Sequence, residues 1–163
     1  MEVSVSAVEN MSEAERQSWI TLIADSLVLA WFWKTMTPGW SLIPSEMSRA
    51  ELGQIYLSLV VITIIYHAVI ASFFEIRKRG SGVEQDERDL LIAAFGANTG
   101  YTVLQFGVGL ILVSGIMGYA YEADIVPFLS IQTPVQFLFA ITFMSYAADL
   151  VRHALILTRY SRD

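Results

Sequence analysis

Acidic, basic and histidine side chains interrupt the apolar segments of this sequence. Apart from Lys34, they are Asp25, His67, Glu75, Asp149, Arg152 and His153. A charged group at the centre of a bilayer costs about 2.5–3.5 kcal/mol on insertion scales. If the apolar segments cross a membrane, these groups therefore need partners. Together they could form ion pairs, bind a ligand or an ion, or relay protons.

Asp149, Arg152 and His153 are spaced i, i+3 and i+4, so in a helix they share one face. This spacing predicts an ion pair in which Asp149 neutralises Arg152, with Asp25 as the other candidate partner of the arginine. A ligand site and a proton relay are the alternatives for the same face. No residue is predicted to be catalytic.

His67 and His153 are the two histidines of the chain, and two histidines on different helices can ligate haem. Haem requires axial ligands at matching heights. His67 lies nine residues before Ile76, roughly 13 Å along a helix, whereas His153 lies about five residues from the end of its segment. We therefore expect no cofactor, with haem on His67 and His153 as the alternative. No metal site is expected, because no His-x3-His or Glu-x-x-His pair occurs.

Four apolar segments must position these residues, and they cover residues 19–36, 52–76, 93–121 and 134–157. A membrane-spanning helix needs about 20 mostly apolar residues. An isolated strand would leave backbone groups unpaired in lipid. The predicted fold class is all-α: a polytopic membrane protein with four transmembrane helices in a bundle, forming a single membrane domain over residues 1–163.

The composition supports this class and excludes others. Hydrophobic residues make up 55% of the chain and charged residues 16%, whereas soluble domains carry about 25% charged residues. A disordered chain and an ordinary cytosolic enzyme are therefore excluded. The net charge of −6 argues against direct nucleic-acid binding. Because the chain has no cysteine, it has no disulfide and no thiolate metal site.

The basic residues predict the topology. Lys34 and Arg49 fall on one side of the four segments, and the other eight lysines and arginines fall on the opposite side. The positive-inside rule then places both termini in the cytoplasm. In this topology Asn98 and Tyr101 join most of the ionisable residues in the inner half of the membrane. The sequence therefore predicts a polar cluster or an inward-open cavity there.

Local signals predict where helices start and where they approach each other. Ser12 with Glu15, Ser48 with Glu51, and Thr133 with Gln136 have the spacing of capping boxes. In the third segment, Gly96 and Gly100 have the small-x3-small spacing that lets two helices pack closely.

A charged motif, Asp86, Glu87, Arg88 and Asp89, precedes the third segment and follows the basic stretch 77–79. Carboxylates in the first turn of a helix stabilise it by about 0.3–1 kcal/mol each, so helix capping is one interpretation. The alternative is that this mixed-charge surface docks a soluble partner.

The sequence DERDLLI at 86–92 and the sequence AADLVRHALILTRYSRD at 147–163 together resemble a family of small prokaryotic four-helix integral membrane proteins of unknown function with a cytoplasmic DERD motif. The resemblance covers the second to fourth segments, about two thirds of the chain. It implies no enzymatic activity. It also implies a link to a small helix-turn-helix regulator, which is often encoded beside such proteins.

Two functions follow as expectations. The first is a non-enzymatic integral membrane protein whose cytoplasmic face binds a partner, such as a small transcriptional regulator or a larger membrane complex; a homo-oligomer is also compatible with the sequence. The second is a redox or transport protein whose inner polar cluster binds haem, quinone or an ion.

Overall fold

The computed structural model describes residues 11–81, 87–121 and 131–162. Within these ranges the chain forms four long helices and one short 3-10 helix. In chain order they are α2 (Glu13–Met36), η1 (Pro38–Trp40), α3 (Arg49–Ser81), α4 (Glu87–Tyr121) and α5 (Pro134–Tyr160). The predicted all-α class is confirmed, and each predicted segment lies within one of the four long helices.

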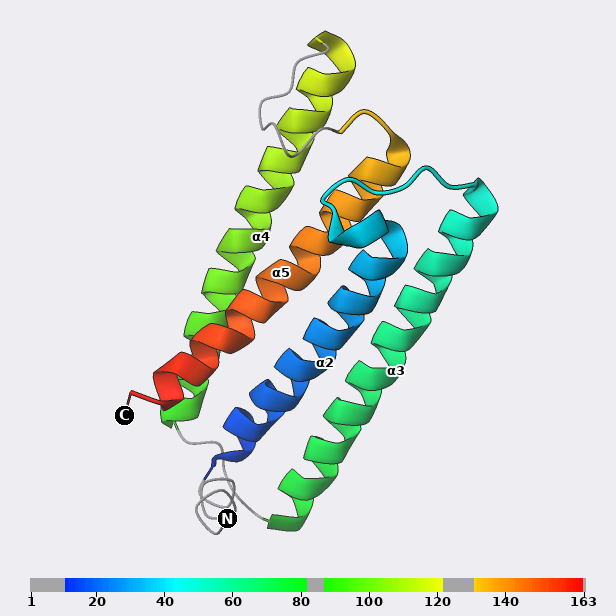
Figure 1. Ribbon diagram of the computed structural model, residues 1–163. Helices are drawn as coiled ribbons and strands as arrows, with labels where there is room; N and C mark the ends of the chain where they lie inside the picture. The colour runs from blue at the N-terminus through cyan, green and yellow to red at the C-terminus, as the bar shows by residue number, and fades with distance from the viewer. Residues whose placement is uncertain (1–10, 82–86, 122–130, 163) are drawn as a thin grey trace.

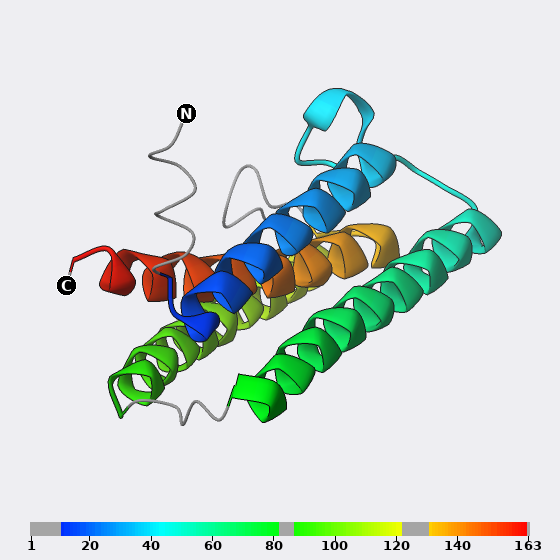
Figure 2. The same cartoon turned by 90° about the horizontal axis from the view of Figure 1, so that it is seen from below.

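The four long helices lie side by side in the order α4, α5, α2, α3 (Figure 1). Helix α5 packs against both α4 and α2, and α3 packs against α2. Seen from below, α3 and α4 lie on opposite sides of this α5–α2 pair (Figure 2). Residues on the face shared by α2 and α5 are therefore the most enclosed of the molecule.

Successive helices run in opposite directions (Figure 1). The start of α2, the end of α3, the start of α4 and the end of α5 consequently share one end of the molecule. Lys34 and Arg49 lie toward the other end, at the end of α2 and the start of α3. This threading is the one that four antiparallel crossings of a membrane would require.

The helix starts follow the predicted capping signals. At α3 the backbone N–H of Glu51 donates to Ser48 Oγ at 3.2 Å, and the Ser48 N–H donates to Glu51 Oε2 at 2.8 Å. At α5 Thr133 and Gln136 form the same reciprocal pair ahead of Pro134. At α2 Ser12 Oγ accepts from the N–H of Glu15 at 3.2 Å. These side chains satisfy N–H groups that the first helical turn leaves without partners.

Glycines bring α4 and α5 into close contact. A Cβ added to Gly96 would lie 2.5 Å from Ile156 Cγ1, and one added to Gly100 would lie 2.9 Å from Arg152 Cβ. Any side chain at these positions would therefore push the helices apart. The predicted role of the Gly96–Gly100 pair in close packing is confirmed, and it applies within one chain.

Three of the four long helices are long and apolar enough to cross a membrane: α3 over Arg49–Ile76, α4 over Glu87–Tyr121 and α5 over Pro134–Tyr160. Helix α2 is not among them, because its apolar stretch is short and contains Asp25 and Lys34. The first predicted span therefore stays a prediction.

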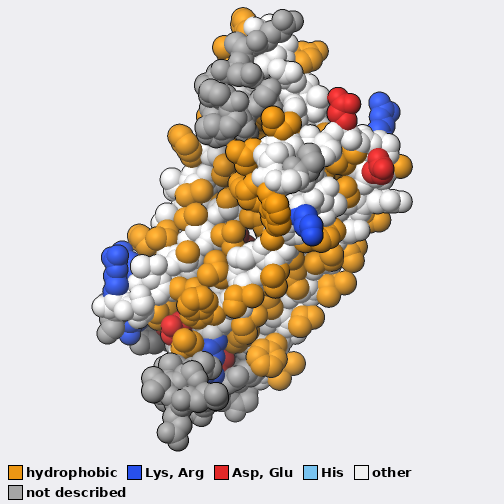
Figure 3. Space-filling view, viewed as in Figure 1, with side chains coloured by type: hydrophobic (Ala, Val, Ile, Leu, Met, Phe, Trp, Pro, Cys, Tyr) orange, Lys and Arg blue, Asp and Glu red, His pale blue; other side chains and the backbone are white. Residues whose placement is uncertain are grey.

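Apolar side chains cover the middle of the molecule on the face seen in Figure 3, and the charged side chains visible there lie toward its two ends. On the outer faces of α3 and α4, large apolar side chains are exposed, among them Leu57, Ile64, Val69, Leu91, Phe106 and Ile116. A soluble monomer rarely exposes so large a continuous apolar surface. This surface suits contact with lipid.

Candidate functional site

Asp25, near the middle of α2, is completely buried, with 0% of its surface exposed. The hydroxyl of Tyr66 on α3 donates a hydrogen bond to Asp25 Oδ1. Within the part of the chain that the structure describes, the second carboxylate oxygen, Oδ2, has no hydrogen-bond partner. A buried polar atom without a partner costs about 1–3 kcal/mol, and more when it is charged. Asp25 is therefore costly to the fold unless something else binds it.

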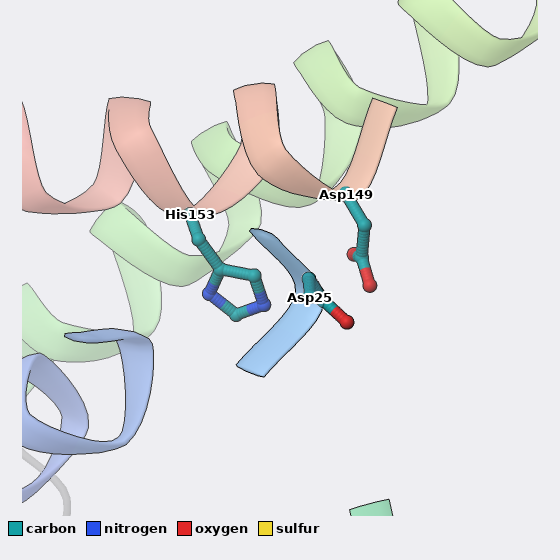
Figure 4. Close-up of side chains that lie close together, drawn as sticks. All are labelled: Asp25, Asp149 and His153. Carbon is teal, nitrogen blue, oxygen red and sulfur yellow. The ribbon is translucent and has the colours of Figure 1, made fainter. Parts of the chain in front are cut away.

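Asp149 and His153 project from α5 toward Asp25 (Figure 4). One carboxylate oxygen from each aspartate and one ring nitrogen of His153 all lie within 4.8 Å of one another. Like Asp25, His153 is buried, with 8% of its surface exposed. The spacing of four residues places the two α5 side chains one turn apart on the face that α5 presents to α2. We call Asp25, Asp149 and His153 the carboxylate–histidine site.

Arg152 forms an ion pair with Asp149, in which Nη1 lies 3.5 Å from Oδ1. Its side chain is 44% exposed, and its Cβ packs against Gly100 of α4. Arg152 therefore approaches Asp149 from the α4 side. Asp25 on the other side accepts its hydrogen bond from Tyr66.

Two further polar contacts join α3 to α5. The hydroxyl oxygens of Thr63 and Tyr146 lie 2.5 Å apart. Thr142 Oγ1 donates a hydrogen bond to the Tyr56 hydroxyl at 3.2 Å. With the Tyr66–Asp25 hydrogen bond, these contacts form a line of polar groups along α3. We call this line the α3 polar seam. It supplies the directional contacts that hold α3 in register with its neighbours.

A cavity of about 380 Å³ opens beside this seam. Asp25 and Asp149 reach it, and Thr63, Tyr66 and Tyr146 line it together with apolar residues of α3. Its volume is at the lower end of the range for small-ligand sites, about 300–1,000 Å³. The cavity is large enough for a small solute with its water, and it leads to the two carboxylates.

The predicted site residues are only partly brought together. His67 is exposed and lines the 380 Å³ cavity; its ring lies 4.3 Å from the Tyr66 ring, and its Nδ1 lies 3.1 Å from the carbonyl oxygen of Thr63. Tyr101 lines a second cavity of about 360 Å³ between α4 and α5, which Asp149 and Arg152 also line. Haem ligation by His67 and His153 stays the alternative to the expectation of no cofactor.

Asn98 and Glu75 are exposed, and neither lines either of these two cavities. Asn98 lies on α4, where its backbone carbonyl accepts from Thr102. Glu75 lies in the last part of α3. Both residues were predicted to join the inner polar cluster, whereas the structure leaves them exposed and outside these two cavities.

The DERD motif begins outside the described residues, where Asp86 lies. Glu87 and Arg88 are exposed at the start of α4. Asp89 accepts a hydrogen bond from the Tyr160 hydroxyl at 2.6 Å, and the Arg88 guanidinium lies 5.9 Å from the centre of the Tyr160 ring. The second half of the motif therefore ties the start of α4 to the end of α5.

Sequence reasoning missed the α3 polar seam. Tyr56, Thr63 and Tyr66 are spaced by seven and three residues, which places them on one helix face. Tyr146 precedes Asp149 by three residues and so shares its face. These spacings were a usable signal. However, tyrosines and threonines insert into membranes at low cost, so they attract less notice than charged residues.

The donor set of the carboxylate–histidine site is two carboxylates and one imidazole, drawn from two helices. Such groups bind protons and cations, and imidazole is also a common ligand of transition metals. Comparison with family models, curated proteins and solved structures found no match to this chain. The resemblance to the DERD-containing membrane protein family therefore stays a prediction.

Proposed function

We propose that the chain is an integral membrane protein in which all four long helices cross the bilayer, with both termini in the cytoplasm of a prokaryote. Support for α2 as a crossing helix comes from its length and its position. Its 24 residues extend about 36 Å, which exceeds the apolar thickness of a bilayer, about 30 Å. It also lies between α5 and α3, two helices that are apolar enough to cross.

We further propose that the protein binds a cation at the carboxylate–histidine site, as an ion-binding or ion-transporting protein. The observation that carries this proposal is the complete burial of Asp25 with Oδ2 unpartnered and Asp149 beside it. Two carboxylates this close repel each other when both are ionised. Arg152 compensates one of them from the α4 side. A bound cation, which includes a proton, would compensate the other.

The cavity supports the same proposal. It connects the carboxylates of the site with the surface between α3 and α5. A cation that reaches a buried carboxylate needs polar groups along its route, because dehydration in an apolar channel is expensive. The hydroxyls of Thr63, Tyr66 and Tyr146 provide oxygen atoms at this position.

Thermal unfolding of the purified protein in lipid nanodiscs tests the proposal. A ligand that binds the folded state stabilises it by about 2.7 kcal/mol at a concentration 100 times its Kd, which corresponds to a shift of several degrees in melting temperature. We expect the melting temperature to rise with one class of added cation or with acidification. Sodium, potassium, magnesium and manganese chlorides at matched ionic strength separate specific binding from charge screening.

Asp25→Asn is the informative variant. Its amide keeps an oxygen for the Tyr66 hydrogen bond but removes the buried charge, so the variant should melt higher than wild type without cation and lose the cation-dependent shift. Glu46→Gln makes the same chemical change at an exposed residue and should retain the shift. A wild-type melting temperature that is independent of both cations and pH would contradict the proposed function.

Partner docking at the start of α4 is a second candidate. It is favoured by the exposure of Glu87 and Arg88 beside one another, at the end of the molecule that we propose to be cytoplasmic. The partner would be a soluble regulator or a subunit of a larger membrane complex. Loss of a co-purifying protein in the charge-swapped variant described in the Discussion tests this candidate separately from the cation site.

A further inference from the structure

We propose that Asp25, Asp149 and His153 bind one divalent first-row transition-metal ion. The inference rests on the proposed cation site and names the class of ion that the site takes. It concerns three side chains that no short sequence motif connects, because Asp25 lies on α2 and the other two residues lie on α5.

The geometry of the three ligand atoms fits one ion. They lie within 4.8 Å of one another. Nitrogen and oxygen ligands bind such ions at about 2.0–2.2 Å, so two ligands on one ion lie at most about 4.4 Å apart. Small rotations of the side chains would close the difference. The helices would not need to move.

Asp25 is oriented for this role. Tyr66 holds Oδ1, and Oδ2 is buried without a partner among the described residues. In metal sites, ligating carboxylates are usually hydrogen-bonded through such outer groups, which fix their orientation. Tyr66 would therefore act as a positioning residue, and Asp25 Oδ2 would be the metal ligand.

The chemistry of the donors selects the ion. Sodium, potassium, magnesium and calcium bind oxygen ligands in preference to nitrogen, whereas imidazole with carboxylates suits manganese, iron, cobalt, nickel and zinc. The negative charge of the two ionised aspartates lowers the cost of holding a divalent ion in apolar surroundings, and Arg152 beside Asp149 offsets one of the two charges. The presence of His153 in the cluster therefore favours a transition metal over an alkali or alkaline-earth ion.

The site would keep coordination positions open toward the cavity. Asp25 and Asp149 line the 380 Å³ cavity, whereas His153 is not among its lining residues. An ion between them would have protein ligands on the α2–α5 side and would face the cavity on the other. Three protein ligands with an open position are typical of sites that exchange a ligand, whereas closed four-ligand sites are structural. This arrangement lets a water molecule or a small ligand from the cavity complete the coordination of the ion.

Cobalt(II) is the probe for the test, because its visible absorption reports the ligand set. The full-length protein is purified with a histidine-free tag, treated with chelator and titrated with Co²⁺ in nanodiscs. We expect saturable binding of one Co²⁺ per chain and its displacement by Zn²⁺. His153→Gln and Asp149→Asn should each weaken binding at least tenfold. Tyr66→Phe should weaken Co²⁺ binding about tenfold, because Tyr66 orients a ligand. It should leave the absorption bands near those of wild type, because Tyr66 does not itself bind the ion.

His67→Gln is the matched control, since it removes a nearby histidine on the cavity wall. It should bind Co²⁺ within twofold of wild type. Helix content and melting temperature are measured for each variant, and Asp25→Asn provides a second loss-of-ligand variant if His153→Gln fails to fold. Wild-type binding and an unchanged spectrum in His153→Gln would overturn the proposal, as would loss of binding in His67→Gln.

The two proposals fail in distinguishable ways. If the melting temperature of the wild type responds to sodium or acid while Co²⁺ and Zn²⁺ do not bind, the transition-metal assignment is wrong and the cation site stands. If neither metals, alkali ions nor acid change the melting temperature, both proposals are wrong.

Discussion

Tyr66 on α3 donates a hydrogen bond to Asp25 on α2, the most buried carboxylate of the described residues. The contact joins an edge helix to one of the two central helices. It also leaves Asp25 with one oxygen bound by Tyr66 and the other, Oδ2, buried without a hydrogen-bond partner among the described residues. Tyr66 therefore serves both the packing of α3 and the orientation of the site.

Replacing Tyr66 with Phe should destabilise the protein. The change removes one hydroxyl and leaves both oxygens of a buried carboxylate unsatisfied, at a cost of about 1–3 kcal/mol. The expected result in nanodiscs is a melting temperature lower by several degrees. Tyr101→Phe is the control, because that hydroxyl is exposed and contacts Gln105 of its own helix. Equal melting of the two variants would mean that the Tyr66 hydrogen bond contributes nothing to stability.

The close approach of α4 and α5 gives a second prediction. Gly100→Ala would place a Cβ 2.9 Å from Arg152 Cβ and 3.2 Å from the carbonyl oxygen of Ala148. Overpacking of this kind costs about 1–3 kcal/mol. We expect Gly100→Ala to lower the melting temperature measured in nanodiscs.

Gly109→Ala is the matched control for that change. Gly109 lies on the same helix, and a Cβ added there meets no atom within 4 Å. Alanine is favoured over glycine in a helix by about 0.5–1 kcal/mol, so this variant should melt at or above the wild-type temperature. If both variants shift in the same direction, the α4–α5 contact at Gly100 is looser than the structure shows.

The proposed topology predicts where reporters are found. Trp40 lies between α2 and α3, and Tyr121 ends α4, so both belong to the end opposite to the start of α2. Reporter fusions at Trp40 and Tyr121 should read as external, and fusions at Gly82 and Asp163 as cytoplasmic, because eight of the ten basic residues fall on that side. An external signal at Gly82 would reverse the proposed orientation. An identical signal at Trp40 and Gly82 would show that α3 does not cross as proposed.

Much of the fold could be predicted from the sequence, because it depends on local signals. The starts of α3 and α5 follow from the side chains of Ser48 and Thr133, which satisfy the first N–H groups of each helix. The close contact at Gly96 and Gly100 follows from the absence of side chains. In each case the sequence signal itself lies in residues only a few positions apart.

The candidate site could be predicted only in part, because it depends on how helices are rotated and ordered. The sequence placed Asp149 and His153 on one face and offered Asp25 as a candidate partner of Arg152. It did not predict that Asp25 lies beside Asp149 and His153 with Tyr66 bound to it. The absence of a His-x3-His pair led to the prediction of no metal site. That criterion examines one helix at a time, whereas the carboxylate–histidine site takes its residues from α2 and α5.

The start of α4 provides the last prediction, which separates partner docking from a structural role of the DERD motif. Asp89 accepts a hydrogen bond from Tyr160, so Asp89→Asn weakens a contact between α4 and α5. This variant therefore tests what the contact contributes to stability. Glu87 and Arg88 are exposed, so a double change of Glu87→Lys with Arg88→Glu keeps the net charge and leaves Asp89 in place.

We expect Asp89→Asn to lower the melting temperature modestly. The amide oxygen can still accept from Tyr160, but the bond changes from one to a charged group, about 1.5–3 kcal/mol, to a neutral one, about 0.5–1.5 kcal/mol. The Glu87/Arg88 swap should melt close to wild type, since both side chains are exposed and a reversed charge near the helix dipole costs about 0.3–1 kcal/mol. Proteins that co-purify from native membranes are then compared by mass spectrometry. If docking occurs at this surface, the swap loses a partner that Asp89→Asn retains. If the swap retains every partner of the wild type, the docking proposal fails. The motif then only stabilises the first turn of α4 and its contact with α5.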